Sequence, residues 1–178
     1  MASNDVTWLA DVLRTEGLDV VEFPGWRGRG HGAFTQIWGI VIHHTGTGEV
    51  PPERIAHGTT TVGGPLGHLH LAQDGTATVI AAGVARHIGT GRYPGLPTDA
   101  AGGHTIGIQA VNTGTEGWSP TQYDALVRCA AAILRTLGQP VSHVIGHREW
   151  NCRHWDPGAL DMDRFRADLA VRVAARSR

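Results

Sequence analysis

The sequence lacks several features that define whole classes of protein. Its two cysteines, Cys129 and Cys152, are too few for a disulfide scaffold and do not form a CxxC pair. No apolar stretch approaches membrane-spanning length, and the first residues lack the basic and apolar regions of a signal peptide. The formal net charge of −1 provides no basic surface for nucleic acid or an anionic membrane. We therefore expect a protein made in the cytosol without its own export signal, with no nucleic-acid partner and no membrane insertion.

Glycine and histidine, in contrast, are abundant. The 25 glycines among 178 residues indicate many tight turns and places where the backbone approaches other groups closely. The sequence also contains 11 histidines, several of them beside apolar runs. Because histidine is the commonest metal ligand and the usual acid–base residue, this composition indicates a metal or catalytic site.

The hydrophobic pattern predicts alternating strands and helices. The clearest element is a helix that follows the capping-box sequence Ser119-Pro120-Thr121-Gln122 and stops at Gly138. Asp74-Gly75, between the alternating runs 68–72 and 76–81, predicts a β-hairpin. The remaining expectations are helices over 4–15 (capped by Asn4), 53–57 and 161–175, strands over 37–44, 104–111 and 141–146, and loops over 23–36 and 83–104. Together they predict an α/β fold, a single domain spanning residues 1–178 with a central mixed β-sheet flanked by helices.

Three places carry candidate chemistry. His43-His44 ends the first expected strand, and only one of the two enters a given site because adjacent strand residues point to opposite faces. His147 directly follows the last expected strand, and Asp156 lies in the turn His154-Trp155-Asp156-Pro157-Gly158. Two imidazoles and one carboxylate leave an open fourth position on a tetrahedral zinc ion, which is typical of catalytic zinc.

Each of these residues also has a purely structural alternative. Taken alone, His43 and His147 would usually cap or hydrogen-bond at a strand end, and Asp156 would be an ordinary Asp-Pro turn residue. His68 and His70 share one strand face and could themselves form a metal pair, although packing near the site is the simpler expectation.

Five segments, in their order along the chain, resemble the type 2 N-acetylmuramoyl-L-alanine amidases: VIHHTGTG, GHLHLAQDGT, ARHIG, HTIGIQAVNTG and IGHREWNCRHWDPG. The same fold occurs in peptidoglycan recognition proteins, and the similarity is nearest to the amidase domains of endolysins from phages of actinobacteria. The resemblance covers about residues 37–166. It implies zinc-dependent hydrolysis of the amide bond between N-acetylmuramic acid and L-alanine in bacterial peptidoglycan. It also implies a monomeric, bacteriolytic enzyme that reaches the cell wall through a holin-like pore.

Carried over residue by residue, the resemblance implies that His43, His147 and Asp156 bind Zn²⁺. Cys152 is the rival third ligand, because recognition proteins often use a cysteine. The resemblance also places His68 and His87 along the substrate groove, which makes them the expected substrate-binding residues.

Two positions depart from the family pattern. Gln109 stands where many relatives have a glutamate general base, and an amide cannot take up a proton. His154 stands where many relatives have a lysine, and a histidine is not a fixed cation near neutral pH. His154 and Gln109 are therefore the candidate catalytic residues for proton transfer, alongside zinc. Gln109 keeps open the alternative of a recognition domain that binds peptidoglycan with weak or no catalysis. A zinc peptidase acting within the stem peptide lacks support, because the sequence has no HExxH motif.

Overall fold

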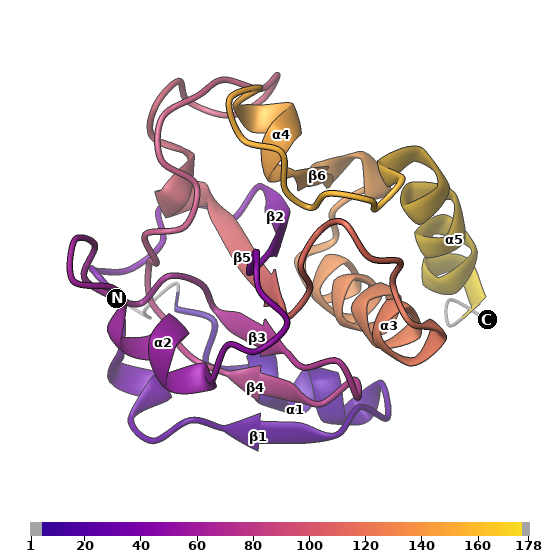
Figure 1. The fold of residues 1–178 in the computed structure, drawn as a ribbon, viewed down its shortest axis with the longest axis horizontal. Helices are drawn as coiled ribbons and strands as arrows, with labels where there is room; N and C mark the ends of the chain where they lie inside the picture. Colours follow the sequence, from indigo (N-terminus) through magenta and orange to yellow (C-terminus); the bar gives the residue numbers. More distant parts are fainter. Residues whose placement is uncertain (1–4, 176–178) are drawn as a thin grey trace.

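The computed structural model describes residues 5–175 and contains a six-stranded mixed sheet (Figure 1). The strands follow the order β1-β4-β3-β5-β2-β6. β3 and β4 pair in antiparallel fashion, and the other neighbours in this sheet pair in parallel. The strand bounds are β1 Val20–Glu22, β2 Gly39–His44, β3 Leu69–Leu71, β4 Ala77–Val79, β5 Thr105–Ala110 and β6 Val144–Gly146. The predicted α/β fold with a mixed sheet is confirmed.

Helices cover the two faces of the sheet unequally. On one face α3 lies between α1 and α5 and packs against both (Figure 1). These three helices are α1 Leu9–Thr15, α3 Pro120–Leu137 and α5 Met162–Ala175. The opposite face carries the long segment 83–104 and two short helices, α2 Pro52–His57 and α4 His147–Trp150. No helix within the described residues is long and apolar enough to cross a membrane.

Alternation along β2 separates the main core from the second face. Ile40 and Ile42 are fully buried in the large hydrophobic cluster that includes residues of α1, α3 and α5. Val41 points the other way and joins a smaller cluster with Ile145 and Trp150. His43 lies two residues after Val41, so its side chain emerges on this second, thinly covered face. The strand thus delivers one histidine to a place where the covering layer consists mainly of loops.

The N-terminus of α3 confirms one half of its predicted capping box. Ser119 Oγ accepts a hydrogen bond from the Gln122 backbone N–H at 3.1 Å, as an N-cap residue should. The Gln122 side chain does not reach back to Ser119. Its Nε2 donates to the carbonyl oxygens of Val111 at 2.8 Å and Leu71 at 3.4 Å. The predicted hydrogen bond from the Gln122 side chain back to Ser119 is therefore absent, because the Gln122 amide binds these two carbonyls instead. At the other end Gly138 adopts a left-handed conformation and stops the helix, as predicted.

Other differences concern short elements. The predicted hairpin forms, with Leu69 paired to Val79 and Leu71 to Ala77. The predicted strand over 141–146 begins as a 3-10 turn and is extended only from Val144. α1 starts at Leu9, and its expected cap Asn4 lies outside the described residues. β1 and α4 were not predicted from the sequence.

Candidate active site

Two adjacent parallel strands bring the first two candidate ligands together. Ile42 of β2 and Gly146 of β6 are register partners, and His43 and His147 are the next residues along each strand. Because parallel strands end at the same edge of a sheet, the two imidazoles emerge side by side. Their rings lie 4.7 Å apart, nearly edge to face. Asp156 reaches the same place, and one donor atom from each of the three residues lies within 4.8 Å of the others. All three residues are buried.

Arg148 holds the loop that carries Asp156. The backbone N–H of Arg148 donates to the Asp156 carbonyl at 2.9 Å, and its guanidinium donates to the carbonyls of Gly158 and Leu160. Gly158 has a positive φ of 60°, and a Cβ there would lie 2.3 Å from the Gly114 carbonyl oxygen. Only glycine fits this crossing of two backbones. The carboxylate is therefore positioned by backbone and guanidinium contacts rather than by its own turn alone.

The inner nitrogens of both histidines face one carboxylate oxygen. His43 Nδ1 lies 2.8 Å and His147 Nδ1 lies 3.1 Å from Asp156 Oδ2. The outer nitrogens face other partners. His43 Nε2 lies 3.0 Å from His87 Nδ1, and His147 Nε2 lies 3.0 Å from the carbonyl oxygen of Ile88.

These outer contacts decide where the ring protons are. A carbonyl oxygen only accepts, so His147 carries its proton on Nε2 and donates it to Ile88. His87 Nε2 faces the Thr105 carbonyl at 3.2 Å, which likewise requires a proton on that nitrogen. His87 Nδ1 is then an acceptor, and His43 donates to it from Nε2. In their neutral forms, both candidate ligand histidines therefore turn an unprotonated Nδ1 toward Asp156.

Burial and charge act together at this cluster. Burial lowers the pKa of His43, which favours the neutral imidazole. Burial opposes ionisation of Asp156, but hydrogen bonds and positive charge from His147 and His43 in their protonated forms outweigh that effect and hold the pKa of the carboxyl below its usual range. Two imidazole lone pairs and an ionised carboxylate thus converge on one point, an arrangement that a metal cation satisfies. The structure brings together the three predicted ligands, whereas Cys152 is exposed and lies outside the group.

His154 lies directly against this cluster. Its ring stacks on His147 with centroids 3.9 Å apart and planes inclined by 18°. Its Nδ1 is 3.8 Å from Asp156 Oδ1, and 49% of its side chain is exposed. Burial lowers the pKa of His154, and proximity to His147 acts in the same direction. The ring therefore reaches both the candidate metal site and solvent.

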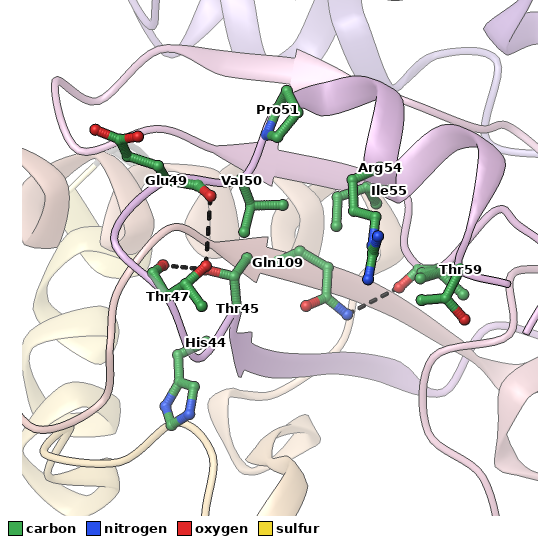
Figure 2. A pocket seen from close by; sticks show the side chains of 11 residues that line it. His44, Thr45, Thr47, Glu49, Val50, Pro51, Arg54, Ile55, Thr59 and Gln109 are labelled. Atoms are coloured by element: carbon green, nitrogen blue, oxygen red, sulfur yellow. Dashed lines mark hydrogen bonds between the residues drawn. The ribbon is translucent and has the colours of Figure 1, made fainter. Parts of the chain in front are cut away.

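Gln109 lines an open pocket beside the cluster. It is the register partner of His43 in the neighbouring strand β5, so both side chains leave the same face of the sheet. Its Nε2 donates to the Leu66 carbonyl at 2.8 Å, and its amide oxygen has no hydrogen-bond partner among residues 5–175 (Figure 2). The pocket has a volume of about 470 Å³. Its lining includes an apolar part, three threonines and two charged groups, namely Val50, Pro51, Ile55, Leu66, Thr45, Thr47, Thr59, Glu49 and Arg54, together with His44 and Gln109.

The expected substrate-binding histidines lie deeper than their predicted role requires. His68 is fully buried, and its Nδ1 accepts a hydrogen bond from the Gly107 N–H at 2.9 Å. His87 is buried between His43 and Thr105, and burial holds its pKa well below the usual histidine value. The position of His68 supports packing rather than substrate contact, because none of its atoms reaches the surface. His70 does not join it in a metal pair, since its Nε2 lies 2.7 Å from the Val50 carbonyl.

Two features near the site were not anticipated from the sequence. Arg54 projects toward the pocket from α2 and has no ionic partner among residues 5–175 (Figure 2). Trp155, half exposed beside Asp156, packs edge-on against His44 with ring centroids 4.3 Å apart. An Arg in a short helix and a Trp in a turn carry no distinctive pattern, so only the folded chain reveals where they lie.

The fold and the cluster define an α/β domain with a buried His–His–Asp group suited to a catalytic metal. The N-acetylmuramoyl-L-alanine amidase family model matches residues 33–159, and the chain therefore belongs to this family. The family and the enzyme class predicted from the sequence are both confirmed. No curated protein sequence matches the chain.

Solved structures show the same fold at low sequence identity. LysCS, an endolysin N-acetylmuramoyl-L-alanine amidase from Clostridium intestinale URNW, is 20% identical with a TM-score of 0.63, over 85% of this chain and 95% of that chain. The endolysin of the Thermus scotoductus MAT2119 bacteriophage Ph2119 is 20% identical with a TM-score of 0.60, over 84% of this chain and 97% of that chain. AmiD from E. coli, solved with an anhydro-N-acetylmuramic acid peptide substrate, is 20% identical with a TM-score of 0.63, over 83% of this chain and 65% of that chain.

Proposed function

We propose that this chain is a zinc-dependent amidase that hydrolyses the bond between N-acetylmuramic acid and L-alanine in bacterial peptidoglycan. The observation that carries the proposal is the convergence of His43 Nδ1, His147 Nδ1 and Asp156 Oδ2 in a member of the amidase family. Two nitrogens and one oxygen suit zinc and leave a position for substrate chemistry. When bound, zinc would supply Lewis acidity toward the scissile carbonyl and would lower the pKa of an attacking water.

The remaining chemistry falls to side chains around the cluster. Cleavage of the amide requires a proton on the departing L-alanine nitrogen. His154 is the best-placed donor, because it stacks on His147 and is half exposed. Gln109 cannot transfer a proton, but its free amide oxygen can accept a hydrogen bond from a substrate N–H or a water. We assign His154 to proton transfer and Gln109 to orientation.

The pocket beside Gln109 supports binding of the stem peptide. Its apolar part suits aliphatic side chains, and the threonine hydroxyls suit peptide groups. Arg54 lacks an ionic partner within residues 5–175, so it can pair with a carboxylate of the stem peptide. Glu49, on the same lining, offers the opposite charge for an amino group.

A peptidoglycan-binding domain with weak or no catalysis is the second candidate, and Gln109 is the feature that favours it. The decisive experiment digests purified cell walls and measures new L-alanine amino termini and new reducing sugar ends. The amidase predicts amino termini without reducing ends, loss of activity with a chelator and recovery with added zinc. The His43→Ala variant should lose zinc and activity, whereas the exposed His57→Ala control should keep both. Binding to walls without amino termini would instead establish the recognition domain.

The biological setting is a further part of the proposal. A phage endolysin role is supported by the fold shared with LysCS and the Ph2119 endolysin. We propose that the whole chain forms one catalytic domain, since the sheet draws its strands from Val20 through Gly146. The monomeric state and release through a holin-like pore stay predictions.

A further inference from the structure

Two consecutive residues contact both candidate metal-binding histidines. His87 Nδ1 lies 3.0 Å from His43 Nε2, and the carbonyl oxygen of the next residue, Ile88, lies 3.0 Å from His147 Nε2. Both residues belong to the long segment 83–104, which is far in sequence from either ligand. Two adjacent residues, one through its side chain and the other through its backbone, therefore contact the outer nitrogens of both imidazoles.

We propose that His87-Ile88 is a positioning segment that fixes the tautomer and orientation of both metal-binding histidines. This inference rests on the proposed function for its metal, and it replaces direct substrate contact as the role of His87. A neutral imidazole binds a metal through its unprotonated nitrogen, so a partner that holds the proton on Nε2 keeps Nδ1 available. Ile88 does this for His147 through a backbone carbonyl. His87 does it for His43 through its own ring.

The state of His87 is set by groups that cannot change their roles. Its Nε2 faces the Thr105 carbonyl at 3.2 Å and the Thr105 hydroxyl at 3.3 Å. That hydroxyl donates its own proton to the Ala101 carbonyl at 2.9 Å and can only accept from His87. The hydrogen bonds therefore run in one direction, from His43 to His87, from His87 to Thr105 and from Thr105 to the Ala101 carbonyl. Reversing His87 would place two lone pairs against each other at Thr105.

Neighbouring residues hold the ring of His87 in place. A Cβ at Gly107 would lie 2.6 Å from His87 Nδ1, so the ring lies directly over a strand residue without a side chain. The His68 ring packs edge-on against His87 with centroids 5.6 Å apart, and His68 itself accepts from the Gly107 N–H. With the ring of His87 held by these contacts, its Nδ1 faces His43 Nε2.

The segment is also tied to the helix that begins with a ligand. Trp150 Nε1 donates to the Gly89 carbonyl at 3.3 Å, and Asn151 Nδ2 donates to the Thr90 carbonyl at 2.9 Å. α4 starts at His147, so the same few residues present one ligand and anchor the segment that supports it. The same segment therefore supports both histidines, and one of them belongs to the helix that anchors this segment.

The test measures tautomers and zinc affinity separately. Long-range nitrogen–proton correlation spectra of the metal-free protein report which ring nitrogen of each histidine carries the proton. We expect the Nε2–H form for His43 and His147. In His87→Ala, His43 should lose this preference while His147 keeps it, and the zinc dissociation constant should rise about 10–100-fold in chelator competition. His87→Asn retains an acceptor near the position of Nδ1 and should recover most of the affinity.

The exposed His31→Ala variant serves as the control and should change neither readout. A His43 ring protonated on Nδ1 in the metal-free protein would overturn the inference. Unchanged tautomers together with unchanged zinc affinity in His87→Ala would overturn it too. A wild-type protein that binds no zinc would instead defeat the proposed function, and the tautomer spectra would still decide the role of His87.

Discussion

Replacing Asp156 by asparagine should stabilise the metal-free protein and destabilise the zinc-loaded protein. In the metal-free state the carboxylate is buried and faces two unprotonated nitrogens, both of them close to the same oxygen, Oδ2. An asparagine Nδ2 in that position carries two N–H groups, one for His43 Nδ1 and one for His147 Nδ1. The substitution therefore replaces repulsion by two hydrogen bonds.

The size of the effect follows from those two contacts. A net hydrogen bond contributes about 0.5–1.5 kcal/mol, so two contribute about 2 kcal/mol to the free energy of unfolding. For a chain of this length that amounts to a rise in Tm of about 4–8 °C. Zinc acts in the opposite direction, since a ligand present at 100 times its Kd stabilises the protein that binds it by about 2.7 kcal/mol. Asp156→Asn loses a charged ligand and should gain little from the metal.

The assay is calorimetric unfolding of both proteins at pH 8, above the ordinary histidine pKa of about 6.5, with either a chelator or zinc. We expect the variant to unfold at the higher temperature with chelator and the wild type to do so with zinc. A wild type that is the more stable protein in both conditions would mean that a proton lies between Asp156 and one of the histidines. The tautomer reasoning would then be wrong.

Three further predictions concern groups around the site. His154→Ala should lower kcat about 10²–10⁴-fold with little change in zinc affinity, and an unchanged kcat would move proton transfer to another group. Arg54→Gln should raise KM for stem-peptide substrates while kcat stays similar, with Arg164→Gln as an exposed control. Equal KM values for both variants would remove Arg54 from the binding pocket. A thiol reagent should label exposed Cys152 in the native protein, and it should label Cys129, whose pKa burial raises to about 12, only after unfolding. Rapid labelling of both thiols in the native state would contradict the buried position of Cys129.

Elements with strong local signals were predictable from the sequence. α3 carries an N-cap serine, an apolar face and a terminal glycine, and all three act as expected. The hairpin of β3 and β4 follows from Asp74-Gly75. β1 was missed because its three residues gain their strand geometry from pairing with β4, a contact that no local pattern reveals. Propensity is a weak guide wherever pairing supplies the stabilisation.

The candidate site, like the fold, was predictable only where the sequence carries a local signal. His43 ends an apolar strand, His147 follows another, and Asp156 lies in a turn that contains a proline, so the sequence was sufficient to group these three candidate ligands. The contacts that support these three residues could not be predicted from the sequence. The roles of His87 and Ile88 depend on the path of an irregular segment of more than twenty residues, which has no periodicity to analyse. That is why His87 was expected at the substrate and instead lies against His43, a candidate metal ligand.

The pairing of β1 with β4 also sets a limit on how this domain can be cut and joined to others. The family match begins at residue 33, after both α1 and β1. Leu9 and Leu13 of α1 are nonetheless fully buried in the main core, and β1 covers the outer edge of β4. A chimeric enzyme joined at residue 33 would expose the backbone edge of β4 and an apolar flank of α3, both of which promote aggregation. Fusion partners should therefore be attached ahead of Val6, outside the segment that closes the sheet.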